Sequence, residues 1–333
     1  MNINHLEKFI LMTKKQVKKE ERKILYFGEY PQTIKADDVT IKDEVDKRGY
    51  YLGSDGAYYD KIVATPYQIL FLDKDKDVGT STEVKKFNEP VGDKINFLEF
   101  PNTKFKMRIV PNVDKYIFSN GHIVLPKKEY YFKVEPIKWV VLKEEGGKAF
   151  VVADSVLDAG CFCEKKDKDA GSNYVPTAQY LTSKIRAWLN DDFLSKAFNK
   201  KEVDLMGIVD VDVTSLGYSV SIKGEIDDKV KLLSLHDVTN FAYGFDSEDK
   251  FKDIGRIRRA SDYAIARGVE INAGYYGNNC AWWLATRSNM SPHDSIVVGQ
   301  DGTANNSGYG IFDKYGVVPA ILIETLVQEE VSK

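Results

Sequence analysis

Few side chains in this sequence have the types and spacing that catalysis or metal binding requires. The four histidines stand far apart, and none is one helical turn from another metal ligand. They are His5, His122, His236 and His293. We expect His236 to cap or pack a helix, and His293, in an expected loop, is the histidine best placed for a function.

The three cysteines give only a weak signal of redox or metal chemistry. Cys161 and Cys163 form a CxC pair without the second pair or the histidine cluster of a zinc site, and Cys280 stands alone. A phosphate-binding glycine loop and a GxSxG elbow do not occur either. We therefore predict no catalytic residue, no metal site and no cofactor.

The most distinctive stretch, residues 274–320, combines aromatic anchors with polar loops. Trp282 and Trp283 are adjacent on an expected strand, so their side chains point to opposite faces and one can anchor the core. Tyr, Asn and Ser around them supply hydrogen bonds and rigid aromatic area, as in antibody loops, although ordinary turns favour the same types. We predict a ligand-binding surface formed by Tyr275, Tyr276, Asn278, Arg287, Asn289, His293, Asp294, Asn305, Asn306 and Tyr309.

Two helices are expected among the elements that position these loops. The first spans Ser183–Phe198, because Thr182 or Ser183 can cap it and apolar residues follow at helical spacing, with a break at 190–192. The second spans Ser261–Arg267 and ends at Gly268.

The rest of the pattern predicts short strands joined by turns. A hairpin turn is expected at 144–147 and an extended X-Pro turn at 30–32. Tryptophans expected in the structural core are Trp139, Trp188, Trp282 and Trp283. Strands are predicted at Ile24–Phe27, Tyr67–Leu72, Phe105–Val110, Tyr116–Phe118, Tyr130–Val134, Ile137–Leu142, Ala149–Ala153, Gly207–Val213, Val230–Leu235, Ser295–Val298, Ile311-Phe312 and Val317–Ile323. This pattern predicts an α+β fold with mixed, mostly antiparallel strands.

Charge and hydropathy exclude several classes of partner. Lys and Arg total 47 against 50 Asp and Glu, a net charge of −3, so no overall field draws the chain onto nucleic acid. No stretch approaches the about 18 apolar residues of a membrane span, and the N-terminus lacks the pattern of a signal peptide. The default location is therefore cytoplasmic, with export without a signal or a place in a phage particle left open.

The length of 333 residues is compatible with two domains at about 150 residues each, but we predict a single extended domain over residues 24–326. Any internal break would fall near Pro136, after a long strand-rich N-terminal half. Residues 1–23 are predicted to form a helical arm and 327–333 a tail. The mixed charges of the arm favour a solvated face over a membrane or nucleic-acid arm, and a homo-oligomer would form through this helix.

Several motifs give the chain a family resemblance. It resembles a family of uncharacterised bacterial domains that are common in Gram-positive gut bacteria, and the resemblance covers about residues 24–323. The matching segments, in order, are Phe27-Gly28-Glu29-Tyr30-Pro31-Gln32, Tyr130–Leu142 with Glu135-Pro136-Ile137-Lys138-Trp139, Ser183–Asn190, Lys231-Leu232-Leu233-Ser234, Ser261-Asp262-Tyr263-Ala264, Trp282-Trp283-Leu284 and Gly316-Val317-Val318-Pro319-Ala320.

This family is similar to the C-type-lectin-like fold of formylglycine-generating enzymes and of retroelement-diversified variable proteins. The resemblance implies a C-type-lectin-like core whose sheet begins at the Trp-Trp-Leu strand and whose loops present the ligand surface. Two departures put a ligand role of the family's arginines in doubt: Ala285-Thr286 intervene before Arg287, and Val318 replaces an arginine. Copper-dependent activity is not carried over, because Cys280 has no partner cysteine in that half of the sequence.

The preferred hypothesis is a non-enzymatic recognition protein that binds a protein or glycan through its C-terminal loops. The first alternative is a divergent enzyme of formylglycine-generating ancestry that uses His293, Asp294 or Cys280. The second is a structural or assembly protein of a phage or injection system, docked through residues 3–23. A subordinate hypothesis is that residues 272–323 are diversified by a retroelement.

Overall fold

The computed structural model describes residues 22–66, 69–72, 96–99, 106–110, 116–163, 178–212, 221–222, 227–246, 252–271 and 278–325. The predicted helix at 3–23 lies outside the described residues except for its last two, and so does the tail at 327–333. The described chain is rich in strands and carries short helices, which is compatible with the predicted α+β class. No helix in these ranges is long and apolar enough to cross a membrane.

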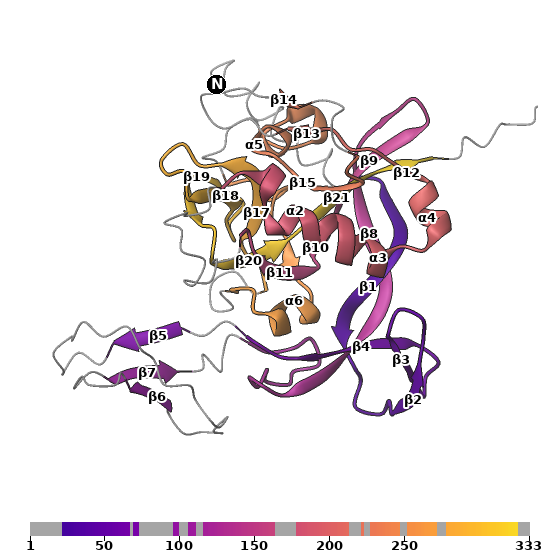
Figure 1. Cartoon of the computed structure of the whole chain (residues 1–333), viewed down its shortest axis with the longest axis vertical. Coiled ribbons are helices and arrows are strands. Elements are labelled where there is room, and N and C mark those ends of the chain that lie inside the picture. The colour runs from indigo at the N-terminus through magenta and orange to yellow at the C-terminus, as the bar shows by residue number, and fades with distance from the viewer. Residues whose placement is uncertain are drawn as a thin grey trace, which may run out of the picture.

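Nine strands form the larger sheet, and every pair in it is antiparallel (Figure 1). The order is β12-β21-β9-β8-β4-β3-β2, with β1 paired to β8 and β15 paired to β21. The strands are β1 (Ile24–Ile34), β2 (Ile41–Val45), β3 (Tyr51–Gly53), β4 (Tyr58–Val63), β8 (Glu129–Glu145), β9 (Lys148–Ala153), β12 (Met206–Gly207), β15 (Val230–Leu232) and β21 (Pro319–Glu324). The β8–β9 hairpin turns at Gly146 and Gly147, both at positive φ, which confirms the predicted turn.

The first strand is longer than the sequence pattern predicted. The expected turn at 30–32 is wrong, because β1 continues through it and pairs with β8 on both sides of two irregularities. One irregularity follows Gly28, whose φ is +67°, and the other follows Pro31, which has no N–H to donate. The strands predicted at Tyr130–Val134 and Ile137–Leu142 are likewise one strand, since β8 runs through Pro136.

Five strands form the second sheet, in the order β11-β20-β17-β18-β19. They are β11 (Asp158–Cys161), β17 (Trp282–Arg287), β18 (Asp294–Val298), β19 (Ala304–Gly310) and β20 (Lys314–Val317). The strand predicted at Ile311-Phe312 is wrong, since these residues form the turn between β19 and β20. Ala285 N–H donates to the Leu233 carbonyl at 2.9 Å, so β17 lies beside the end of β15 in the larger sheet.

Smaller pairings complete the sheets. The strands β10 (Ser155–Val156) and β16 (Arg259–Ala260) form a parallel pair, and β10 directly precedes β11 in sequence. Further strands are β5 (Ile69–Leu72), β6 (Asn96–Glu99) and β7 (Lys106–Val110) in a three-stranded sheet, and the pair β13 (Val211–Asp212) and β14 (Ser221–Ile222).

The helix predicted at Ser183–Phe198 is confirmed as one helical segment with an irregular middle. Ser183 Oγ accepts from Arg186 N–H and caps α2 (Lys184–Trp188), a π-helical turn follows at η3 (Leu189–Phe193), and α3 (Leu194–Ala197) ends the segment. Asn190 lies in this turn, and its side chain donates to the Arg186 carbonyl at 3.1 Å and also bonds the backbone of Lys229 and Val230 at 2.9–3.1 Å.

The second predicted helix is confirmed at α6 (Asp262–Arg267). Ser261 Oγ caps it, and Gly268 ends it at a φ of +104°. The other helices among the described residues are η2 (Tyr180–Thr182), α4 (Lys200–Asp204), α5 (Leu235–Val238) and η4 (Phe241–Tyr243).

Three of the four tryptophans lie fully inside the core. Trp139, Trp282 and Trp283 have no exposed surface, and each indole N–H donates to a backbone carbonyl, of Phe27, Arg256 and Gly160 respectively. Trp188 is only partly buried and packs against the same core. Part of its side chain therefore remains accessible.

Candidate functional site

A cavity of about 660 Å³ opens beside the edge strand of the five-stranded sheet. Its walls come from β11, β20, α2 and the last residue of α6, which lie close together at the centre of Figure 1. This volume is within the range of small-molecule sites. The apolar and thiol-bearing walls include Cys161, Cys163, Ile185, Trp188, Phe312 and Val317, and the charged ones are Asp158, Lys184, Asp192, Arg267 and Lys314.

The carboxylate of Asp158, in the cavity wall, is held by three hydrogen bonds. Its carboxylate accepts from Tyr30 O–H at 2.8 Å, from Arg267 Nε at 3.0 Å and from the Ala159 N–H at 2.6 Å. Burial and the Asp158 charge raise the pKa of Tyr30, so this phenol stays a donor, and Asp158 raises the pKa of Arg267. Asp158 is therefore an anchor for Arg267 and is not placed as a free base.

The N-terminal half of the chain holds α6, and through it Arg267, in place. Asp262, the first residue of α6, accepts from Ile34 N–H at 3.0 Å and from the Ser119 hydroxyl and N–H. Tyr263 donates to Asp60 on β4 at 3.0 Å, and burial raises the pKa of Tyr263. The larger sheet therefore fixes the position of a cavity residue more than 200 residues away in sequence.

Lys314 supplies the second cation of the cavity wall. Its Nζ donates to the Arg267 carbonyl at 3.2 Å and to Thr65 Oγ1 at 3.4 Å. Burial and the nearby Arg267 lower the pKa of Lys314. An anion entering the cavity would offset the repulsion from Arg267, because it adds a counter-charge where two cations lie close together.

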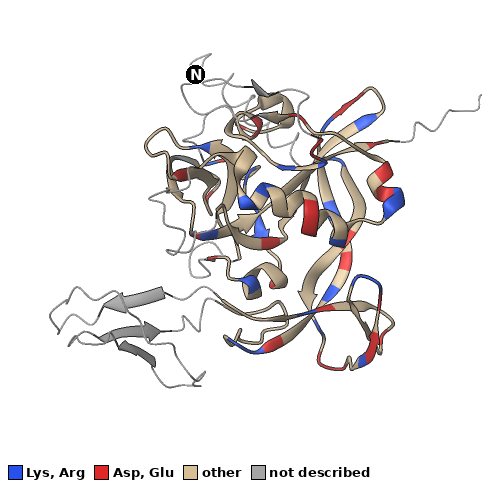
Figure 2. Cartoon of the chain, in the orientation of Figure 1, with Lys and Arg blue, Asp and Glu red and all other residues tan. Residues whose placement is uncertain are grey.

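The charge balance of the cavity favours a negative ligand. Lys184, Arg267 and Lys314 face Asp158 and Asp192, and Asp158 is already paired to Arg267. Elsewhere the two signs alternate along the described chain without gathering on one side (Figure 2). The excess of positive charge in the cavity is thus local, and it stands next to the apolar surface of Trp188 and Phe312.

None of the predicted loop residues whose side chains the structure describes lines this cavity. Tyr275 and Tyr276 lie outside the described residues, and of Asn305 and Asn306 only the backbone, in β19, is described. Asn278 lies in a turn before β17, and Asn289 is exposed between β17 and β18.

The sheet brings the other predicted residues together at the β17–β18–β19 end. Ser295 pairs with both Arg287 and Tyr309, so these two side chains belong to the same face on either side of it. Arg287 Nε is buried and has no hydrogen-bond partner among the described residues. The ring of Tyr309 packs on that of Tyr315 with 5.2 Å between the ring centroids, and the ring of Tyr315 packs on that of Trp283 with 4.8 Å between the centroids.

Hydrogen bonds to its backbone groups hold the turn before β18 in place. His293 N–H donates to Ser291 Oγ at 3.1 Å, and the His293 carbonyl accepts from Ile311 N–H at 3.2 Å. The Asp294 carbonyl accepts from Ser288 N–H at 2.9 Å. His293 and Asp294 are both partly exposed, and Asp294, the strand neighbour of Ser295, points to the face opposite to that of Arg287.

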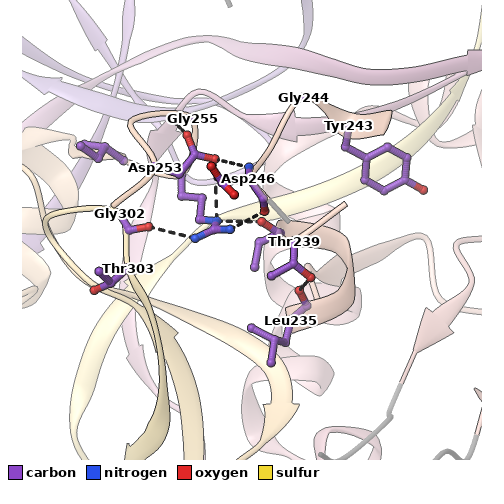
Figure 3. A network of polar contacts seen from close by, with 12 residues as sticks. Leu235, Thr239, Tyr243, Gly244, Asp246, Asp253, Gly255, Gly302 and Thr303 are labelled. Carbon is purple, nitrogen blue, oxygen red and sulfur yellow. Dashed lines mark hydrogen bonds and ion pairs between the residues drawn. The ribbon is translucent and has the colours of Figure 1, made fainter. Parts of the chain in front are cut away.

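A second polar cluster lies away from the cavity, and Figure 3 shows its contacts around Asp253. In this arginine cluster, formed by Arg256, Arg258 and Asp253, Arg256 has no exposed surface and donates to the carbonyls of Val238 at 2.7 Å, Asp246 at 2.6 Å and Gly302 at 3.3 Å. Asp253 lies 3.8 Å from Arg256 and accepts from Gly255 N–H at 2.7 Å. These contacts tie together the end of α5, the loop at Asp246 and the turn at Gly302, and none of the three cluster residues lines the cavity.

The remaining candidates for chemistry are enclosed. Cys280 is 1% exposed and burial raises its pKa, which does not support the hypothesis that this thiol reacts. No group of three or more potential metal ligands occurs among the residues that the structure describes.

Comparison with known families identifies the part of the chain that builds the cavity. A family model described as a domain of unknown function, DUF6273, matches residues 146–325, which is more than half of the chain. The chain belongs to the DUF6273 family. Comparisons with curated proteins and with solved structures gave no match. Every residue that lines the cavity lies inside the DUF6273 segment, whereas Tyr30 and Thr65 support the cavity from outside it.

Sequence reasoning missed the charged residues of the DUF6273 cavity. Asp158 and Arg267 are 109 residues apart, and neither belongs to a motif that we recognised. The available signals were the CxC pair at Cys161 and the position of Arg267 at the end of a predicted helix. Neither signal indicates which distant side chain it meets.

Proposed function

We propose that this DUF6273 protein is a ligand-recognition protein that binds a small organic anion in the cavity between β11, β20 and α2. The observation that carries the proposal is the pair of cations Arg267 and Lys314 beside the apolar surface of Trp188 and Phe312. Sites that bind small ligands typically combine apolar walls with a few convergent polar groups. The ligand we expect therefore has a carboxylate or similar anionic group on an aromatic or aliphatic body.

Naphthoate is a suitable probe, with naphthylmethanol as its uncharged counterpart. Trp188 reports binding, because it is the tryptophan that lines the cavity while Trp139, Trp282 and Trp283 are fully buried. We expect naphthoate to quench the tryptophan fluorescence in a saturable way, and naphthylmethanol to bind more weakly. Trp188→Phe should remove most of the signal.

The matched variants are Lys314→Met and Lys42→Met. Lys314→Met should weaken naphthoate binding about tenfold, since a hydrogen bond to a charged group contributes on the order of 1.5 kcal/mol. Lys42 lies on β2 and does not line the cavity, so Lys42→Met should bind as the wild type does. Equal binding by both variants, or no preference for naphthoate over naphthylmethanol, would contradict the proposal.

A second candidate function is recognition of a protein or glycan by the loops at the β17–β18–β19 end. The observation that favours it is Arg287, whose buried Nε has no partner among the described residues, beside Tyr309 on the same face. A glycan array provides the test: Arg287→Gln should lose signals that Arg259→Gln, at an exposed arginine on β16, retains. An array without signals for the wild type would exclude glycans.

We also propose the finer fold relationship that the sequence resemblance implies, a C-type-lectin-like core for the DUF6273 segment. The five-stranded sheet with loops after β17 and β18 supports it. An experimentally solved member of the family, compared with lectin-like folds, is the test. The enzyme and assembly hypotheses stay predictions, as does retroelement diversification.

A further inference from the structure

One cysteine stands at the wall of the cavity next to a lysine. Cys161 ends β11 and is directly paired with Lys314 on β20, so both side chains lie on one face of the sheet. Cys161 is half-buried and lines the cavity, and its Sγ donates to the Phe312 carbonyl at 3.1 Å. A reagent that fits the cavity can therefore reach this sulfur.

The other two thiols are less accessible. Cys163 also lines the cavity but is 7% exposed, and burial raises its pKa. Cys280 is 1% exposed and lies away from the cavity. Because the thiolate is the nucleophile and needs both exposure and a positive surrounding, Cys161 is the thiol that these conditions favour.

We propose that Cys161 is a modification site that forms mixed disulfides with anionic low-molecular-weight disulfides. The inference rests on the proposed anion site, because Lys314 and Arg267 would attract the incoming anion. The Cys161 proton passes to solvent, and the thiolate attacks one sulfur of the reagent. A new S–S bond forms, the S–S bond of the reagent breaks, and its second half leaves as a thiolate with the electron pair.

The modification would also regulate the site. A cavity of about 660 Å³ has room for an attached group the size of a short peptide. The attached anion would lie against Lys314, where we place the anionic group of the ligand. The modified protein should therefore bind naphthoate at least about tenfold more weakly, and an excess of a small thiol should restore binding by the reverse exchange.

The experiment compares two disulfide reagents of opposite charge on the full, reduced chain. The reagents are the dianion dithiobis(nitrobenzoate) and the dication cystamine, and peptide mapping by mass spectrometry locates the adduct. For each reagent, the rate constant of its reaction with the protein is divided by the rate constant of its reaction with a small uncharged thiol, N-acetylcysteine amide. We expect Cys161 to react first and the dianion to be favoured at least about tenfold over the dication.

Matched variants decide whether the cavity is responsible. Cys161→Ser should remove the fast reaction, Lys314→Met should remove most of the preference for the dianion, and Lys42→Met should keep both. First reaction at Cys163 or Cys280, or a dianion preference no larger than that of the small thiol, would overturn the inference. Naphthoate binding to the unmodified chain is measured separately, so an unreactive Cys161 in a protein that binds naphthoate overturns this inference alone.

Discussion

The cavity and the arginine cluster each hold an arginine near an aspartate, but they differ in what surrounds the pair. Arg256 has no exposed surface, and backbone carbonyls from three separate segments accept its hydrogen bonds. Arg267 is 42% exposed in its side chain and shares Asp158 with Tyr30. The hydrogen-bonding groups of Arg256 are used to hold backbone segments together, whereas Arg267 is partly exposed and lines the cavity.

The pKa shifts of two arginines, Arg258 in the arginine cluster and Arg267 in the cavity, follow the same difference. In the arginine cluster, burial lowers the pKa of Arg258 to about 10, and the nearby Arg22 adds to this effect. In the cavity, the charge of Asp158 outweighs burial and raises the pKa of Arg267. A buried cation without enough counter-charge is a structural strain, while a cation already paired can meet a ligand without that penalty. Ligand chemistry is therefore expected at the cavity and not at the arginine cluster.

The largest expected effect is on stability, for Arg256→Met. The change removes the hydrogen bonds that the carbonyls of Val238, Asp246 and Gly302 accept from Arg256, although the Gly302 carbonyl also accepts from Asp253 N–H. A buried acceptor that loses its donor costs about 1–3 kcal/mol, so we expect the free energy of unfolding to fall by on the order of 3–5 kcal/mol over these contacts. Urea unfolding should show this loss, and a smaller one for Arg267→Met, because Asp158 keeps Tyr30 and the Ala159 N–H. Equal losses would mean that the two regions do not differ as we describe.

The next effect concerns Gly302, which the arginine cluster packs against. Its φ is +83°, and a Cβ there would lie 2.1 Å from the Asp253 carbonyl oxygen. Gly302→Ala must therefore shift backbone as well as adopt an unfavourable conformation, and we expect a loss of about 2–3 kcal/mol. Thermal or urea unfolding measures it. A variant as stable as the wild type would show that this loop is free to move.

Local patterns account for the parts of the fold that the sequence allowed us to predict. The helices at Ser183–Phe198 and Ser261–Arg267 carry their own capping residues, Ser183, Ser261 and Gly268, so a short window is enough. The length of β1 was missed, because Gly28 and Pro31 are typical of turns. A neighbouring strand as long as β8 overrides that tendency by pairing on both sides of each irregularity.

The cavity could not be predicted in the same way. It depends on β11 pairing with β20, which places Cys161 opposite Lys314 across more than 150 residues of sequence. It also depends on contacts such as Tyr30 with Asp158, between a strand of the N-terminal half and the DUF6273 segment. Such positions follow from the topology of the sheets, and no spacing along one segment encodes them. The polar loops after Trp283 were visible because their composition alone is unusual.

A smaller effect is expected in the pH dependence of naphthoate binding. The pKa of Lys314 is lowered in the folded chain. As the pH rises, this lysine therefore loses its charge at a lower pH than an ordinary lysine does. Naphthoate affinity should therefore fall by up to about tenfold over that range. In the same range the unfolded chain binds more protons, so the contribution of this lysine to stability rises with pH. Lys314→Arg should retain affinity at higher pH, because arginine stays charged. A pH profile identical in the two proteins would remove Lys314 from the site.

The smallest expected effect on stability is for Gly160→Ala in the cavity wall. A Cβ at Gly160 would meet Val317 Cγ2 at 4.0 Å, which is ordinary contact, and Gly160 is not in the left-handed region. We expect the free energy of unfolding to change by less than about 0.5 kcal/mol, against several times that for Gly302→Ala. The added methyl group occupies cavity space, so naphthoate affinity should fall modestly while stability does not. If Gly160→Ala instead lost as much stability as Gly302→Ala, the cavity wall would be as tightly packed as the arginine cluster. The cavity would then have no spare space for a ligand.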